Sequence, residues 1–466
     1  MTTIKLLTFN AWGLRLISKF RNERLKALGD ILADPISDDE DYDIVALQEV
    51  WTEEDWAYID NMCKQRYPYR RHFKSGIIAG PGLALLSKIP IEETFLYRFP
   101  INGRPSAVFR GDWYVGKSIA VTLLKPVTPN STPIALLNSH MHAPYSLEGD
   151  ASYSCHRACQ AWDFAKYVRM LRKAGYAVIQ VGDLNSQPGT LPHRLFTVEG
   201  GLDDSWELCH PEKYSRSDIA TMTPIDQIRK AGITCDSVLN TWRINRPIED
   251  ACRLDYAFVD SSYITPIRAE VRFIDPIPEL NCSLSDHFAY FVELDIADYD
   301  ANVVRRVRSD SYGAARAIRA RKGSSASNTF PSTSTTKDDE FRDLKARVLV
   351  YRDLLTEISK YRRYTIPYQS SWRKHHFFSS IAIVVGLHFV VTLSAVRSDP
   401  IAAGFTMLVS LLVGVSGIIN GLIWGLGIRA ESRALQEVQQ QVKDKVNAIK
   451  DEVNEFLDWP TGEIDD

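Results

Sequence analysis

Seven polar side chains stand at or just beyond the ends of stretches that are typical of β-strands: Asn10, Glu49, His140, Asp183, Asn185, Asp255 and His287. Carboxylates and amides are the oxygen donors that hold a hard cation such as Mg²⁺, with water and phosphate completing the coordination. A histidine beside an acid can act as a general base near neutral pH. Singly, each residue fits an ordinary cap or turn. Because buried polar groups are costly unless paired, the seven together predict a cleft where they converge on a cation.

The elements that must position these side chains alternate between strands and helices. Alternating residues or short apolar runs predict strands over 4–10, 43–49, 77–87, 117–124, 133–142, 177–183, 253–259 and 288–294. Thr52 opens a capping signal for a helix to about Arg66, and residues 150–174 have the spacing of an amphipathic helix. Such a mixture favours an α/β sandwich with the sheets packed inside.

Six of the seven polar positions lie in five motifs that resemble the DNase I-like endonuclease/exonuclease/phosphatase superfamily over roughly residues 1–297. The motifs are Asn10, Leu47–Val50, Gly182–Asn185, Arg253–Tyr256 and Ser285–His287. The resemblance implies a four-layered α/β sandwich and a Mg²⁺-dependent phosphoesterase.

The same resemblance implies roles for the individual residues. Glu49 would be the principal Mg²⁺ ligand with Asn10 nearby, and His287 would be the base, held by Asp255. The remaining roles are orienting the attacking water and a phosphoryl oxygen (Asp183 and Asn185), donating to the phosphate (His140) and contacting the substrate (Asn185 and His142). The scheme is coherent because the metal neutralises developing charge while the carboxylate fixes the imidazole tautomer.

Two further stretches narrow the resemblance. Residues 138–143 and 80–91 resemble neutral sphingomyelinases and, with the tail described below, fungal inositol phosphosphingolipid phospholipases C. This likeness implies hydrolysis of a phosphosphingolipid to ceramide and a phosphorylated headgroup. Phosphoinositol and phosphocholine headgroups both remain open, because the residues themselves specify only a phosphoester.

Residues 111–118 match the Walker A pattern letter by letter. That motif works as a turn between a strand and a helix whose amides hold phosphate. Here Ile119–Leu124 follows, which favours a strand, so we do not expect nucleotide binding. The segment is similar instead to the P-loop-like region of neutral sphingomyelinases, which implies that Asp112 and Lys117 form a regulatory switch. A surface salt bridge is the alternative.

Composition bounds the class of protein. The chain has 466 residues and a net charge of −3, so no overall basic field draws it to nucleic acid. Its seven cysteines lack a repeating spacing, which favours reduced thiols, and zinc binding by Cys155, His156 and Cys159 is a minor alternative. The N-terminus runs directly into a strand, so we expect no signal peptide.

The last third of the chain differs from the rest. Residues 1–299 are expected to form the catalytic domain, and 300–337 a basic, Ser/Thr-rich linker. An amphipathic heptad helix is predicted over 338–363, a transmembrane hairpin over 376–428, and an amphipathic helix with an acidic tail over 429–466. The two amphipathic helices can pair within the chain or with a second chain, so a homodimer through the heptad and transmembrane helices is one expectation.

Charge sets the expected orientation of the hairpin. Its spans, 377–396 and 401–428, are joined only by 397–400, so both outer ends lie on one side. Basic residues flank those ends (Arg362, Arg363, Arg373, Lys374, Arg429 and Arg433), whereas the turn carries one Arg. The positive-inside rule then places the catalytic domain and both termini in the cytosol. An endoplasmic reticulum or mitochondrial outer membrane location is expected.

We therefore expect a membrane-anchored, Mg²⁺-dependent phospholipase C that acts on phosphosphingolipids, with an anionic phospholipid as its activator and no nucleic-acid partner. Tethering raises the effective concentration of a lipid substrate. The alternatives are a tethered nuclease or inositol polyphosphate phosphatase of the same superfamily, and a membrane scaffold without catalysis.

Overall fold

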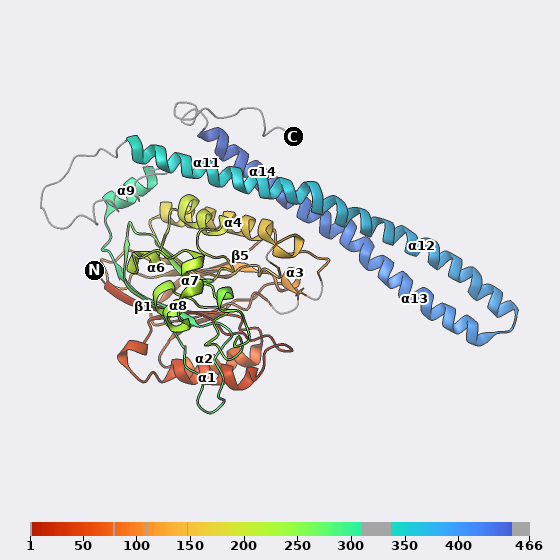
Figure 1. Cartoon of the computed structure of the whole chain (residues 1–466), viewed down its shortest axis with the longest axis horizontal. Coiled ribbons are helices and arrows are strands. Elements are labelled where there is room, and N and C mark those ends of the chain that lie inside the picture. Colours follow the sequence, from red (N-terminus) through yellow and green to blue (C-terminus); the bar gives the residue numbers. More distant parts are fainter. Residues whose placement is uncertain (1, 78–79, 108–109, 147, 310–336, 450–466) are drawn as a thin grey trace, which may run out of the picture.

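The computed structural model describes residues 2–77, 80–107, 110–146, 148–309 and 337–449 (Figure 1). Two six-stranded sheets lie face to face, covered by helices on both outer sides. The first sheet has the order β11-β12-β1-β2-β4-β3, and the second has the order β5-β6-β7-β8-β10-β9.

The first sheet is built around β1, which pairs in parallel with β2 and antiparallel with β12. Its strands are β1 (Thr2–Asn10), β2 (Ile44–Gln48), β3 (Tyr69–His72), β4 (Ala84–Ser87), β11 (Ile264–Arg272) and β12 (Ala289–Ile296). The second sheet has a matching parallel pair, β7 and β8, with β10 antiparallel to β8. Its strands are β5 (Ile91–Arg98), β6 (Ser118–Leu124), β7 (Ile134–His140), β8 (Ala177–Asp183), β9 (Asp203–Asp204) and β10 (Asp255–Val259).

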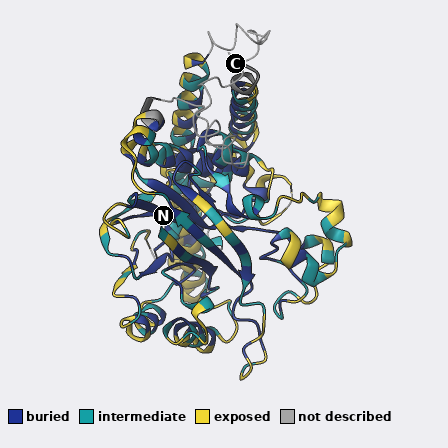
Figure 2. Cartoon of the chain, turned by 90° about the vertical axis from the view of Figure 1, so that its left-hand side faces the viewer, coloured by how far each residue is buried: buried dark blue, intermediate teal, exposed yellow. Residues whose placement is uncertain are grey.

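The layers follow from the apolar faces of the strands. Alternate residues of both sheets, such as Leu6 and Ile179, meet in one core between them. The opposite face of the first sheet packs against α1 (Arg21–Ala33) and α2 (Glu53–Cys63), and that of the second against α4 (Ser154–Ala174). Figure 2 shows most strand residues as buried, with exposed residues on the edge strands such as β11. The expected four-layered α/β sandwich is confirmed.

Several element boundaries differ from the sequence-based expectations. The strand expected over 77–87 is confined to β4, because the positive-φ glycines Gly80 and Gly82 interrupt the extended run before it. The linker expected over 300–337 begins as a helix, α9 (Ala301–Ser309), whose Val304 is buried against the domain. Residues 310–336 lie outside the described part of the chain, as do 450–466 at the end of the expected acidic tail.

The C-terminal helices run as two long rods that dock on α4. The first rod comprises α11 (Lys337–Lys360), a π-helical segment and α12 (Ile366–Val396). The second comprises α13 (Pro400–Leu422), another π-helical segment and α14 (Arg429–Ala448). On α4, Trp162 donates its indole N–H to Gln441 Oε1 at 3.0 Å, and its ring meets Tyr351 edge-on. The heptad seam is thus filled within the chain, so these helices pair intramolecularly.

Beyond α4 the hairpin of α12 and α13 projects away from the domain (Figure 1). Both rods contain a stretch that is long and apolar enough to cross a membrane, and little of it is buried within the protein. Asp399 caps α13 by accepting the amide N–H of Ala402 at 3.0 Å. Gly417 and Gly421 let the two helices approach closely, since a Cβ at either would lie within 2.6 Å of α12 side chains.

Candidate active site

All seven polar residues lie at one edge of the sandwich, because the directions of the strands bring their ends together there. The parallel strands β1 and β2 end at Asn10 and just before Glu49, and the parallel strands β7 and β8 end at His140 and Asp183. Their antiparallel neighbours β10 and β12 begin at this edge with Asp255 and just after His287, while Asn185 follows β8. Carboxyl ends of some strands and amino ends of others therefore coincide.

Asn10 joins the two sheets at this edge. Its side-chain amide donates to Glu49 Oε1 at 3.0 Å and to Asp183 Oδ2 at 3.0 Å. His140 Nε2 lies 3.6 Å from the same Asp183 oxygen and 3.9 Å from Glu49 Oε1. All four side chains are buried or nearly so. The expected convergence of residues from distant parts of the chain is therefore present.

His287 and Asp255 form the second half of the site. His287 Nδ1 lies 2.8 Å from Asp255 Oδ2, and Nε2 lies 3.8 Å from Asp183 Oδ2. Burial opposes the charged imidazole, but Cys235 and the carboxylates of Asp255 and Asp183 outweigh it and raise the pKa of His287 well above its ordinary value. Asp255 therefore holds the ring with Nε2 directed toward the carboxylate group, which is the arrangement of a base with its orienting acid.

His140 and Asn185 complete the edge. Burial, followed by Lys117 and His287, lowers the pKa of His140 well below its ordinary value, so its ring is neutral and can donate one N–H. Asn185 donates its side-chain amide to Met141 O at 3.1 Å. It adopts a φ of 47°, and Glu49 a φ of 58°; strained backbone of this kind is frequent at functional sites.

The carboxylates of Asp183, Glu49 and Asp255 lack enough positive charge around them, which a bound cation would supply. Burial, with help from Asp255, raises the pKa of Asp183 to about 7, and burial together with Asp286 raises the pKa of Glu49. The second oxygen of Asp255 is buried without a hydrogen-bond partner. A divalent cation would supply the positive charge that these groups lack, so the residues fit the expected Mg²⁺, with Glu49 and Asn10 to hold it.

The raised pKa of Asp183 predicts that metal binding at this edge depends on pH. Between about pH 4 and 7 the folded, cation-free protein holds a proton that the unfolded chain has lost, so its stability falls as pH rises through that window. Below pH 7 a cation must displace this proton. We expect the increase in unfolding temperature that Mg²⁺ causes to grow from pH 6 to 7.5 and then to level off. In Asp183→Asn most of the Mg²⁺-induced increase in unfolding temperature should vanish. If Mg²⁺ raised the unfolding temperature of the unaltered chain equally at pH 5.5 and 8, the proposed competition between Mg²⁺ and a proton on Asp183 would be wrong.

The expected switch residues lie directly behind the site. Asp112 is the first residue of a single helical turn, α3 (Asp112–Val115), and β6 follows it, so the Walker-like segment lacks the long helix that phosphate binding requires. Lys117 Nζ lies 3.5 Å from Asp112 Oδ1 and donates to Met141 O at 3.0 Å. Both side chains are buried, so the alternative of a surface salt bridge is wrong.

His142 differs from its expected role. Its ring is wholly buried, stacks on Tyr153 with a centroid separation of 3.9 Å, and places Nε2 3.4 Å from Asp112 Oδ2. Support of Asp112 therefore fits His142 better than the expected contact with substrate. The minor zinc alternative is not supported either, since His156 pairs with Glu431 Oε1 at 2.9 Å instead of joining Cys155 and Cys159.

The sequence analysis did not identify two residues that lie at the site. Trp51 directs its indole N–H toward Glu49 Oε2 at 3.4 Å. Cys235 places Sγ 3.5 Å from His287 Nε2. Trp51 could have been found from its place two residues after Glu49, whereas Cys235 comes from an irregular segment whose position depends on tertiary packing.

Together, the fold and the site define a phosphoester hydrolase of the DNase I type, in which a buried acid–histidine pair faces a cluster of carboxylates. The sequence model of the endonuclease/exonuclease/phosphatase family matches residues 7–287. The chain belongs to this family.

The relatives that it resembles include two yeast proteins. It is 47% identical over 458 residues to the inositol phosphosphingolipids phospholipase C of Saccharomyces cerevisiae, covering 95% of this chain and 90% of the relative. The Schizosaccharomyces pombe protein of the same name is 43% identical over 299 residues, covering 63% of this chain and 68% of the relative. Human sphingomyelin phosphodiesterase 2 is 34% identical over 203 residues, covering 44% of this chain and 46% of the relative. Among solved structures, sphingomyelinase C from Streptomyces griseocarneus has a TM-score of 0.46 at 18% identity, over 63% of this chain and 99% of that one.

Proposed function

We propose that the chain is a membrane-anchored, Mg²⁺-dependent phospholipase C that hydrolyses phosphosphingolipids to ceramide and a phosphorylated headgroup. The observation that carries the proposal is the His287–Asp255 pair, 2.8 Å apart, facing the carboxylates of Glu49 and Asp183. The names of the yeast and human relatives support a phosphosphingolipid as the substrate.

The proposed mechanism assigns each residue a task. Glu49, with Asn10 beside it, would hold Mg²⁺, and the bound ion would supply positive charge to balance the negative charge that develops on the phosphate. Positive charge bound beside Glu49 and Asp183 would oppose the charged imidazole and lower the raised pKa of His287. His287 Nε2 could then accept a proton from the attacking water, while Asp255 holds the N–H of Nδ1. Asp183 and Asn185 orient the water and a phosphoryl oxygen. The water oxygen forms a bond to phosphorus as the bond from phosphorus to the ceramide oxygen breaks, and the ceramide oxygen takes up a proton from solvent as it leaves.

His140 acts on the phosphate in this scheme. Its low pKa keeps the imidazole neutral, so it donates one N–H to a phosphoryl oxygen without placing a second charge beside the metal. Lys117 and Asp112 act through Met141 O, which Lys117 shares with Asn185, so they position the loop that carries the phosphate-binding amide.

The hairpin is the proposed membrane anchor, with the catalytic domain and both termini in the cytosol. Gly427, at the base of the hairpin, lies against Pro105, where a Cβ would come within 2.6 Å of Pro105 Cγ. This contact keeps the base of the anchor next to the segment that leads to Asp112. An anionic phospholipid as activator suits the basic residues that flank the spans. An endoplasmic reticulum or mitochondrial outer membrane fits this topology. Because α11 and α14 pair within the chain, a homodimer would form through the hairpin helices α12 and α13.

A substrate panel tests the proposal. The full chain, reconstituted in phosphatidylcholine liposomes with and without an anionic phospholipid, is given inositol phosphoceramide, sphingomyelin, single-stranded DNA and an inositol polyphosphate in parallel. We expect ceramide release from at least one sphingolipid, only with Mg²⁺, and at least tenfold faster with the anionic lipid. Cleavage of DNA or of the inositol phosphate without ceramide release would identify one of the alternative enzymes, and no turnover of any substrate would favour the scaffold.

A further inference from the structure

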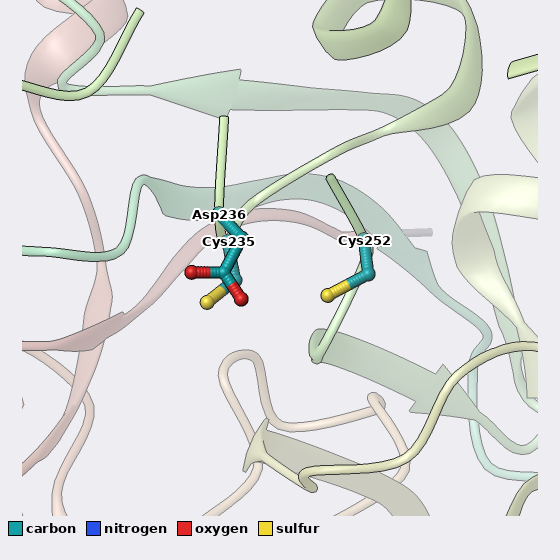
Figure 3. A group of neighbouring side chains, drawn as sticks. All are labelled: Cys235, Asp236 and Cys252. Carbon is teal, nitrogen blue, oxygen red and sulfur yellow. The ribbon is translucent and has the colours of Figure 1, made fainter. Parts of the chain in front are cut away.

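A second group of metal-ligating atoms lies next to His287. Cys235, Asp236 and Cys252 place one ligand atom each within 4.8 Å of the others (Figure 3). Cys235 and Cys252 exchange two backbone hydrogen bonds of 3.0 Å as an isolated antiparallel bridge, which directs their side chains to the same face. In Figure 3 the Cys252 sulfur points toward Cys235 and Asp236.

A fourth ligand atom comes from the catalytic base. Cys235 Sγ lies 3.5 Å from His287 Nε2. Zinc–sulfur bonds of about 2.3 Å and zinc–nitrogen bonds of about 2.05 Å, at a tetrahedral angle, put sulfur and nitrogen ligands about 3.5 Å apart. The spacing of these two atoms is therefore that of neighbouring ligands on one tetrahedral ion.

We propose that Cys235, Cys252 and His287 bind a thiophilic divalent cation such as Zn²⁺, with Asp236 as fourth ligand, and that this cation inhibits hydrolysis by occupying Nε2 of His287. The binding stands on the geometry of these four residues, whereas the inhibition rests on the proposed function.

The chemistry of the donors separates this site from the neighbouring Mg²⁺ site. Mg²⁺ takes oxygen ligands and retains water, whereas two thiols and an imidazole select zinc-like ions. Cys235 and Cys252 are buried, at 5% and 9% exposure, so they are protected from solvent. Asp236 also faces Arg243 and Arg246, at 3.4 and 3.6 Å, which makes it the most readily exchanged ligand.

The geometry favours a metal over a disulfide between the two cysteines. A disulfide would join only the two sulfur atoms, whereas a metal ion would also use His287 Nε2, which lies 3.5 Å from Cys235 Sγ, and the carboxylate of Asp236. Another group of ligating residues, His193, Asp204 and Glu207, differs because Asp204 already pairs with Arg253 at 2.7 Å.

Co²⁺ titration tests the binding independently of activity. The full chain in detergent, freed of metal and kept reduced, is titrated with Co²⁺ while the sulfur-to-cobalt charge-transfer absorption is recorded, and Zn²⁺ is then added as competitor. The variants are Cys252→Ser and, as a matched control, Cys209→Ser, which removes a thiol outside the group. We expect the absorption in the unaltered chain and in Cys209→Ser, its loss in Cys252→Ser, and its displacement by Zn²⁺.

Activity assays at fixed Mg²⁺ complete the test. We expect Cys252→Ser to keep its basal rate and unfolding temperature, and to need at least tenfold more Zn²⁺ for half-inhibition than Cys209→Ser. Equal absorption or equal inhibition in the two variants would overturn the proposal, as would inhibition that a reductant reverses and a chelator does not. Absorption without hydrolysis of any substrate would support the metal site and refute the proposed function.

Discussion

His287→Gln should lower kcat about 10³-fold while the protein stays folded. Transfer of a proton to a positioned base contributes about 10²–10⁴-fold, and glutamine cannot accept a proton at neutral pH. The glutamine amide can still donate to Asp255, so the buried carboxylate is not left unpaired. The measurement is steady-state hydrolysis of the preferred sphingolipid with circular dichroism of the same sample. Full activity in His287→Gln would exclude the mechanism.

Two further variants separate the role of the base from structural effects. Asp255→Asn removes a charge that raises the pKa of His287, so kcat should fall and the acidic limb of the pH–rate profile should move to lower pH. A purely structural role for Asp255 would lower the rate without that movement. His210→Gln is the matched control, because this ring stacks on Trp206 within the fold and should leave both quantities unchanged.

The catalytic edge was predictable because its residues sit where strand patterns stop. Asn10, Asp183 and Asp255 terminate or begin buried strands, and a polar group in such a position needs a partner. Strand direction then brings these residues together. A sequence pattern is enough to predict this, because it shows where each strand ends. The placement of His142 was not predictable in this way. Whether its ring points into the cleft or behind it depends on the turn after β7 and on Tyr153, which lies on a different element.

The missed elements have weak local patterns. β5 is an edge strand whose residues are mostly half-buried or exposed, so it lacks an apolar run, and α1 has its buried residues interrupted by charged ones. The heptad pattern also could not predict that the C-terminal helices α11 and α14 pack against the catalytic domain. The predicted seam consists of Phe341, Leu344, Val348, Tyr351, Leu355 and Ile358. Val350 and Leu354 fall outside it yet are fully buried, because α11 contacts α4 as well as α14. A single heptad seam predicts packing against one partner helix, whereas α11 packs against two.

Glu49→Gln should lower kcat about 10³-fold and remove most of the Mg²⁺-induced increase in unfolding temperature. Glutamine is nearly the same size as glutamate, and its carbonyl oxygen can still accept the N–H of Asn10, now 3.0 Å from Glu49 Oε1. What it lacks is the charge that binds the cation and thereby stabilises the transition state.

The same substitution should leave the cation-free protein at least as stable as the unaltered chain. Burial and Asp286 raise the pKa of Glu49, so its charged form is disfavoured in the fold, and a neutral amide avoids that cost. Unfolding temperatures in EDTA and in Mg²⁺ test both statements on one preparation. Glu53→Gln is the control, since this exposed carboxylate pairs with Lys74 away from the catalytic edge and should change neither activity nor the response to Mg²⁺. Undiminished Mg²⁺-dependent turnover in Glu49→Gln would mean that Glu49 does not hold the catalytic cation.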